Sequence, residues 1–252
     1  MLSLPAGVRA CLFDLDGVLT PTAAVHAAAW KETFDDFLRQ RAARGGEEFR
    51  AFDPVADYDE YVDGKPRVDG TRSFLASRDI TLPEGQPDDP PSRDTIQGLS
   101  ARKDEAFSRR LGDGVQPYEG SLRYLRAARD AGLRRAVVSS SKHCAAVVAA
   151  AGIDDLLEVR VDGIVAERER LRGKPTPDTY LCAARMLGVE PEAAAVFEDA
   201  LAGVAAGRAG GFGYVVGVDR VGQADALRAH GGDTVVRDLA ELLDRPESGT
   251  GR

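Results

Sequence analysis

Two aspartates two residues apart follow an apolar run near the start of the chain. The run reads Leu-Phe-Asp-Leu-Asp-Gly-Val, in which Asp14 and Asp16 are the two carboxylates. Alternate side chains of an extended strand point to the same face, so these two carboxylates would share one face. Gly17 lets the backbone turn sharply where a ligand could approach. An isolated pair of this kind more often only marks a strand end, so its meaning depends on what lies elsewhere in the chain.

Three later segments carry matching chemistry. Ser139 follows a Val-Val pair, Lys174 lies in Gly-Lys-Pro-Thr-Pro-Asp, and Glu198 and Asp199 follow Ala-Val-Phe. Each has a structural alternative: a helix cap for the serine, a solvated loop for the lysine, and first-turn helix charges for the acidic pair. A carboxylate that attacks a phosphate monoester, however, needs cations to spread the negative charge of the phosphoryl oxygens. Asp14, Glu198 and Asp199 offer the oxygen ligands that magnesium prefers. Lys174 adds a fixed positive charge, and the Ser139 hydroxyl can hold phosphate oxygens.

The elements that must position these residues alternate between strand and helix. We expect strands at Arg9–Leu15, Arg135–Ser139, Ala193–Glu198 and Phe212–Val218, with a weaker one at Thr234–Val236. A helix is predicted to begin at Pro177 and to end at Gly188. This alternation predicts an α/β fold with a doubly wound, mostly parallel sheet. Ligands of such folds gather at the carboxyl ends of the strands.

The alternation breaks between residues 22 and 114. The interval begins with Trp30, Phe34, Phe37 and Leu38 at the spacing of one helix face. We therefore expect a helical cap domain at 22–114, inserted into a core made of residues 1–21 and 115–252. Within the insertion, Asp79–Gly98 carries four prolines among acidic and small residues, which predicts an exposed loop.

Composition narrows the class of function. The chain has 252 residues, of which 43% are apolar and 29% charged, as in ordinary soluble globular proteins. A net charge of −8 argues against a nucleic-acid partner, because such proteins need a basic surface. No run is long enough to span a membrane, and the first residues lack the pattern of a signal peptide. The three cysteines lack disulfide-framework or zinc-site spacing, and together these features predict a cytoplasmic protein.

The order and spacing of these segments resemble the four motifs of the haloacid dehalogenase superfamily. The resemblance implies a Rossmann-like core and magnesium-dependent phosphoryl transfer through an aspartyl-phosphate at Asp14. It implies that Asp16 is the general acid/base and lends its main-chain carbonyl to the metal. The implied site comprises the catalytic pair Asp14 and Asp16, the metal-binding residues Asp14, Asp16, Glu198 and Asp199, and the phosphate-binding residues Ser139, Ser140 and Lys174.

The insertion resembles the helical cap of the β-phosphoglucomutase-like branch of that superfamily. His26 and Trp30 lie four residues apart, so a helix would place them on one face. Packing in the core of the insertion would by itself explain both side chains, whereas the resemblance implies that His26 orients Asp16. Arg67 lies in a loop resembling one whose arginine grips the distal phosphate of a sugar bisphosphate, a task that suits the guanidinium fork. Lys103 resembles a lysine that reaches the sugar phosphate, with a solvated helix-face cation as the equal alternative.

Three positions depart from that branch: Pro21 stands where many relatives have an acidic residue, Gly70 where serine is frequent, and Asp104 where asparagine is common.

Our first hypothesis is interconversion of β-glucose 1-phosphate and glucose 6-phosphate through a 1,6-bisphosphate, which would also act as an activator. The rival is a phosphatase of the same fold that hydrolyses a sugar phosphate or another small phosphate monoester. A dehalogenase, which needs no magnesium, and a non-catalytic binding protein are less favoured. For the mutase and for the phosphatase the partner is a small phosphorylated metabolite, and for the mutase this metabolite is a hexose phosphate.

Overall fold

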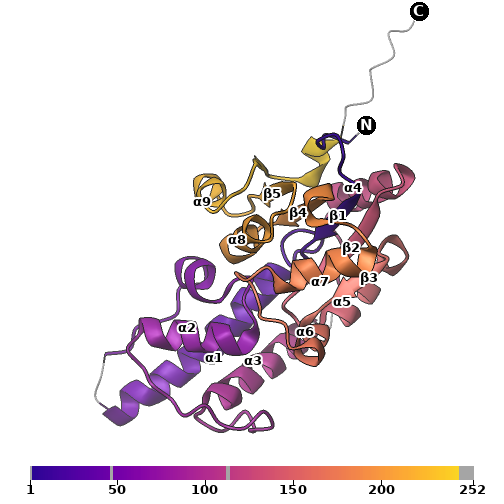
Figure 1. Ribbon diagram of the computed structural model, residues 1–252. Coiled ribbons are helices and arrows are strands. Elements are labelled where there is room, and N and C mark those ends of the chain that lie inside the picture. Colours follow the sequence, from indigo (N-terminus) through magenta and orange to yellow (C-terminus); the bar gives the residue numbers. More distant parts are fainter. Residues whose placement is uncertain (1, 46–47, 112–113, 244–252) are drawn as a thin grey trace, which may run out of the picture. The chain divides into compact units, whose positions relative to one another are not determined.

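The computed structural model describes residues 2–45, 48–111 and 114–243 of the chain (Figure 1). The chain folds as two compact units. The first, which we call the core unit, comprises Met1–Thr20 and Gln116–Arg252. The second, the inserted unit, comprises Pro21–Val115. Every strand of the sheet described below belongs to the core unit, whereas the regular structure described for the inserted unit is helical.

The core unit is built on a parallel sheet. In the described residues its strands are β1 (Ala10–Phe13), β2 (Arg134–Val138), β3 (Val159–Val161), β4 (Ala194–Glu198), β5 (Tyr214–Val218) and β6 (Thr234–Val236), in the order β3-β2-β1-β4-β5-β6. Phe13 of β1 lies in register with Val137 of β2 and with Phe197 of β4. The strand order reverses between β1 and β4, and open α/β sheets bind their ligands at such a reversal. The predicted doubly wound sheet is confirmed, with each expected strand within two residues of its observed ends, but β3 was not predicted.

Helices cover both faces of this sheet. They are α4 (Glu119–Asp130), α5 (Cys144–Ala150), α6 (Gly163–Glu169), α7 (Asp178–Leu187), α8 (Leu201–Ala209) and α9 (Ala224–Ala229). On one face, Leu12 and its strand neighbours are buried with side chains of α7, α8 and α9. On the other face, Phe13 stacks on Phe197 with 4.6 Å between ring centroids, and Tyr124 of α4 packs 6.1 Å from Phe13. Both faces are therefore apolar, as expected of a parallel sheet that is covered on both sides.

Helix α7 illustrates how local sequence sets the ends of these elements. It follows Pro177, whose ring fixes φ near the helical value, and its first turn begins with Asp178. It ends at Gly188, which adopts a left-handed φ of 68° that favours glycine. The predicted helix is thus confirmed, with Pro177 at the cap position instead of inside the first turn.

The inserted unit consists of α1 (Thr22–Gly45), a π-helical turn at Tyr58–Val62, α2 (Arg67–Ser77) and α3 (Ile96–Arg110). The four large residues expected on one face of α1 are all buried in its apolar core. Helix α3 begins at Ile96, because Thr95 caps it by accepting a hydrogen bond from the Gly98 N–H at 3.0 Å. The last three residues of the loop predicted at Asp79–Gly98 are therefore helical, and that boundary was wrong.

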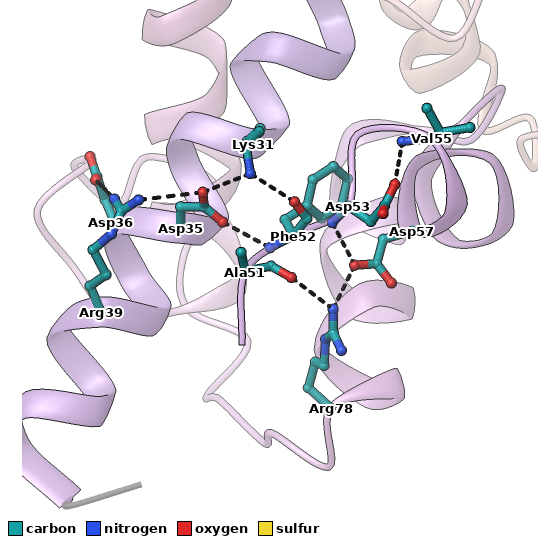
Figure 2. A network of polar contacts seen from close by, with 10 residues as sticks. All are labelled: Lys31, Asp35, Asp36, Arg39, Ala51, Phe52, Asp53, Val55, Asp57 and Arg78. Atoms are coloured by element: carbon teal, nitrogen blue, oxygen red, sulfur yellow. Dashed lines mark hydrogen bonds and ion pairs between the residues drawn. The ribbon is translucent and has the colours of Figure 1, made fainter. Parts of the chain in front are cut away.

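Polar contacts fasten the segment around Phe52 to the helices of the inserted unit (Figure 2). The Asp35 carboxylate accepts from the Phe52 N–H at 2.8 Å, while Lys31 donates to the Phe52 carbonyl at 2.9 Å. Arg78 forms a 2.5 Å ion pair with Asp57, and both side chains are nearly buried. A loop without regular structure is thus held at two points by charged groups that are themselves paired.

None of the helices in the described residues combines the length and the hydropathy needed to cross a lipid bilayer. Cys11, Cys144 and Cys182 are all buried and carry free thiols. Burial raises the pKa of Cys11 to about 12, so this thiol stays protonated and packs as a small apolar side chain.

Candidate active site

Asp14 lies at the carboxyl end of β1, between β2 and β4. Its N–H donates to the Phe197 carbonyl at 2.9 Å and so continues the ladder between the strands. The Lys174 ammonium is 2.5 Å from Asp14 Oδ1 and 2.6 Å from Glu198 Oε1, and it donates to the Val138 carbonyl at 3.1 Å. Only 3% of Lys174 is exposed, so the alternative of a solvated loop lysine is wrong. The structure brings a carboxylate nucleophile candidate and its cation together in a buried position.

Glu198, the last residue of β4, is held by more than this lysine. The Tyr180 hydroxyl of α7 donates to Glu198 Oε1 at 2.8 Å, and the Ala200 N–H donates to Oε2 at 3.1 Å. Gly203 of α8 lies so close that a Cβ there would be 1.7 Å from Glu198 Oε1. Strand, helix α7 and helix α8 thus all contribute to the position of one buried carboxylate.

Asp199 completes a cluster of acidic oxygens. One carboxylate oxygen each of Asp14, Glu198 and Asp199 lies within 4.8 Å of the others, and all three residues are buried. Gly17 has a φ of +87°, and a Cβ at this residue would be 1.6 Å from Asp199 Oδ2. Glycine is therefore required at position 17 for its backbone conformation and for the space that Asp199 occupies.

The electrostatics of the cluster favour a cation. Burial raises the pKa of Asp14 well above its usual range; the Lys174 ammonium opposes this shift, and the charges of Glu198 and Asp16 add to it. Burial disfavours the Lys174 ammonium, yet the carboxylates of Asp14 and Glu198 outweigh that effect and raise the pKa of Lys174. The buried carboxylates of Asp14 and Glu198 thus both contact the Lys174 ammonium, and Asp199 adds a third carboxylate to the cluster. An all-oxygen donor set with excess negative charge fits a hard divalent cation such as Mg²⁺.

Asp16 and Ser139 lie beside this cluster. Ser139 Oγ donates to Asp16 Oδ2 at 3.4 Å and accepts from the Ser141 N–H at 3.1 Å, which fixes the hydroxyl at the end of β2. The Asp16 carboxylate is not one of the three clustered groups, which are those of Asp14, Glu198 and Asp199. Ser140 is half-buried, and its main-chain carbonyl lies close to Gly163.

In the inserted unit, His26 and Lys103 form one contact. Lys103 Nζ lies 2.6 Å from His26 Nδ1, and 4.8 Å from the centroid of the Phe107 ring, on which His26 stacks at 4.0 Å. A lysine ammonium can donate to Nδ1, because it carries three N–H donors and no acceptor. Only 4% of Lys103 is exposed, and the reading of it as a solvated cation is wrong.

Trp30 packs against aromatic side chains of the inserted unit, and Arg67 forms an ion pair within it. Trp30 is 4% exposed and stacks on Phe34 at 4.9 Å, so it belongs to the apolar core and has little surface for a ligand. Its ring also lies 5.3 Å from Lys103 Nζ, and its assignment to the substrate site stays a prediction. Arg67 forms an ion pair with Asp104 of α3. Asparagine at position 104 could not supply that negative charge.

Sequence reasoning missed two groups around the core site. Tyr180 lies in α7 and its acceptor Glu198 ends β4, 18 residues later, and no spacing rule connects them. Arg220 donates from Nε to the Gly17 carbonyl at 2.8 Å. It follows β5, so the rule that ligands gather at carboxyl ends of strands would have found it.

The sequence and the fold of this chain are similar to those of known proteins. A family model described as haloacid dehalogenase-like hydrolase matches residues 8–211. The chain is 57% identical over 247 residues to β-phosphoglucomutase of Mycobacterium tuberculosis, covering 96% of this chain and 94% of that protein. It is 27% identical over 232 residues to hexitol phosphatase A of Escherichia coli, covering 92% and 91%. A solved structure of β-phosphoglucomutase from Clostridium difficile has the same fold, with a TM-score of 0.73 at 22% identity and 94% of each chain covered.

Proposed function

This chain belongs to the haloacid dehalogenase-like hydrolase family, and we propose on that basis that it transfers phosphoryl groups through an aspartyl-phosphate at Asp14. One observation carries the proposal: the buried Asp14 carboxylate lies 2.5 Å from Lys174 and belongs to the cluster with Glu198 and Asp199. A carboxylate in that position can attack a phosphate only where nearby positive charge offsets the negative charge of the phosphoryl oxygens.

Each core residue has a distinct part in this proposal. Asp14 attacks phosphorus and the substrate oxygen leaves. Lys174 holds Asp14 and carries positive charge next to the oxygens that become more negative. Asp14, Glu198 and Asp199, with the main-chain carbonyl of Asp16, would hold Mg²⁺, which supplies further positive charge when bound.

Proton transfer is assigned to Asp16. A group that protonates the leaving oxygen must be able to exchange its proton, which a carboxylate outside the metal cluster can do. The hydrogen bond from Ser139 Oγ at 3.4 Å orients this carboxylate. When phosphate is bound, the Ser139 hydroxyl and the main chain at Ser140 would contact its remaining oxygens.

We propose further that the substrate is a hexose phosphate and that the reaction is the interconversion of β-glucose 1-phosphate and glucose 6-phosphate. The 57% identity to the mycobacterial β-phosphoglucomutase supports this substrate. In this mutase reaction a sugar 1,6-bisphosphate is formed as intermediate and acts as activator, and the inserted unit must bind its distal phosphate. Arg67 and Lys103 would supply the cationic groups for that phosphate, and His26 would orient Asp16.

A phosphatase is the second candidate, favoured by the likeness to hexitol phosphatase A over most of both chains. It would use the same Asp14 chemistry but pass the phosphoryl group to water. The difference between the two functions lies in the acceptor, which is a sugar hydroxyl in the mutase.

One assay separates the candidates. The full chain is incubated with β-glucose 1-phosphate, Mg²⁺ and a trace of the 1,6-bisphosphate, and glucose 6-phosphate and inorganic phosphate are both measured. A mutase yields mainly glucose 6-phosphate, whereas predominant release of phosphate would contradict the mutase proposal. The Asp14→Asn variant is expected to keep its fold by circular dichroism and to lose both activities; retained turnover would overturn the assignment of the nucleophile itself.

A further inference from the structure

The loop that follows β5 contacts the segments after β1 and after β4, which carry the acidic cluster of the core unit. Arg220 Nε donates to the Gly17 carbonyl at 2.8 Å, in the loop after β1. Gln223 Nε2 donates to the Asp199 carbonyl at 3.1 Å, directly after β4. The two carboxylate-bearing loops are therefore each held, through a main-chain carbonyl, by side chains three residues apart in a third loop.

Arg220 is itself fixed in place. Its guanidinium lies 3.8 Å from the centre of the Tyr118 ring, a short cation–π stacking distance. Its Nη1 donates to the Arg237 carbonyl at 2.7 Å and to Asp238 at 3.3 Å. The side chain is 17% exposed. Arg220 is thus held by contacts outside the loop after β1, and its hydrogen bond to the Gly17 carbonyl holds that loop in turn.

The backbone of the bracing loop is also ordered by its own hydrogen bonds. Asp219 Oδ1 accepts from the Gly222 N–H at 2.7 Å and from the Gln223 N–H at 2.8 Å. These contacts close a tight turn between the two bracing side chains. The separation between Arg220 and Gln223 is therefore set locally.

The distance between the two braced loops matters for the carboxylates. Gly17 and the Asp199 carboxylate lie in such close contact that no Cβ fits between them. A shift of either loop would therefore move Asp199 relative to Asp14 and Asp16, which precede Gly17 in the same loop. Cation binding depends steeply on such spacing, because Mg²⁺ demands near-ideal octahedral geometry.

We propose that Arg220 and Gln223 are positioning residues that set the spacing of the acidic cluster for Mg²⁺. The inference rests on the proposed function for the identity of the cation. Both residues act through main-chain carbonyls, and neither is assigned a step in the chemistry. Groups that orient metal ligands in this indirect way typically change metal affinity about 10- to 100-fold when they are removed.

The test compares Arg220→Met with a matched control in the same unit. Arg208 also donates to a glycine carbonyl, that of Gly231, from Nε at 3.1 Å and Nη2 at 2.7 Å, and it also pairs with an aspartate. Arg208→Met therefore removes the same kind of bond between a different pair of segments. Mg²⁺ affinity of the full chain is measured by titration calorimetry without substrate, so the readout does not depend on activity.

We expect Arg220→Met to weaken Mg²⁺ binding about tenfold or more, with Arg208→Met unchanged. The apparent KM for Mg²⁺ should rise with it, while kcat at saturating Mg²⁺ is largely retained. Arg220→Lys, which can still donate to Gly17, should recover part of the affinity. Gln223→Ala removes a single side-chain bond and provides a second reading if Arg220→Met does not fold.

Unchanged Mg²⁺ affinity in a folded Arg220→Met or Gln223→Ala protein would overturn the inference and leave the proposed function standing. Equal weakening by Arg208→Met would also overturn it, because the effect would then be a general loss of stability. Failure of the wild-type chain to bind Mg²⁺ would instead overturn the proposed cofactor, and this inference with it.

Discussion

Replacing Lys174 by methionine removes the ammonium and keeps most of the side-chain volume. In the structure this ammonium lies 2.5 Å from Asp14 and 2.6 Å from Glu198, and the lysine side chain is 1% exposed. The variant therefore leaves two buried carboxylates without the charge that neutralises them. It also leaves the Val138 carbonyl without the donor that is 3.1 Å away in the wild type.

Removing one partner of a buried ion pair costs about 3–5 kcal/mol, because the remaining charge is uncompensated. At about 2–4 °C per kcal/mol for a domain of this size, the unfolding temperature of the core unit should fall by about 6–20 °C. Mg²⁺ should restore part of the loss, because a cation bound among the carboxylates replaces the missing charge. Burial already raises the pKa of Asp14 in the folded state, so folded protein takes up a proton there more readily. The loss should therefore be smaller in acid and grow as the pH rises through the pKa of folded Asp14.

The assay is thermal unfolding with and without Mg²⁺, with Lys142→Met as the control. Lys142 forms a 2.5 Å pair with Glu167, but the two side chains are 46% and 66% exposed, so its loss should cost less than about 1 kcal/mol. The double variant Lys174→Met, Glu198→Gln should be less destabilised than the sum of the single variants, because one uncompensated charge is removed. If Lys174→Met unfolds at the same temperature as Lys142→Met, the ammonium does not balance the cluster and the electrostatic reasoning is refuted.

Four further substitutions test other parts of the molecule. Asp199→Asn should shift the Mg²⁺ dependence of the rate to higher concentration, and an unaltered metal titration would move the metal site elsewhere. Arg67→Ala should reduce turnover of a sugar bisphosphate more than hydrolysis of a small aryl phosphate. Equal losses of Arg67→Ala on both substrates would argue against a distal clamp. Asp104→Asn, which removes the carboxylate that pairs with Arg67, should lower the KM for the bisphosphate. Burial, reinforced by the charge of Asp53, raises the pKa of half-buried Asp59 to about 6 from an unfolded value near 3.8. The stabilisation from its protonated form is therefore complete below the unfolded value and lost as the pH rises through about 6. Asp59→Asn should thus be more stable than wild type above that pH and lose this advantage in acid, and a pH-independent difference in unfolding temperature would show that the carboxyl is not the cause.

The sequence predicted the sheet well because its central strands are continuous apolar runs. Burial on both faces of a parallel sheet produces such runs, as in Ala10–Phe13 and in the first four residues of β4, Ala-Ala-Val-Phe. Strand β3 escaped because it has three residues, Val-Arg-Val, of which only Val161 is buried. A segment so short carries no period that distinguishes a strand from a loop.

The candidate site was predictable to the extent that it lies at strand ends. Asp14, Ser139 and Glu198 follow or end adjacent strands, so their convergence follows from the sheet order. The positive charge of Lys174 was predicted, but its burial and its contact with Glu198 were not, because a Gly-Lys-Pro segment is equally typical of an exposed loop. The support given to Glu198 by Tyr180 depends on packing of α7 against the sheet, which no local pattern encodes.

Residues of the inserted unit were harder to interpret for a physical reason. A helix face shows which residues are apolar but not which charged residue is buried with them, so Lys103 could not be distinguished from a surface lysine. Trp30 lies on the same apolar face as Phe34, and its burial follows from that spacing alone. The ion pair between Arg67 and Asp104 joins two helices and depends on their packing.

Strand β1 lies in the middle of the sheet, yet both of its neighbours come much later in the chain. During synthesis Ala10–Phe13 must wait until the inserted unit and β2 have been made, and then longer for β4, which follows β2 and β3 in the chain. An apolar strand with open edges readily pairs with other chains until its own partners arrive. The yield of folded protein in a cell should therefore depend on what shields this short segment while the ribosome completes the rest of the polypeptide.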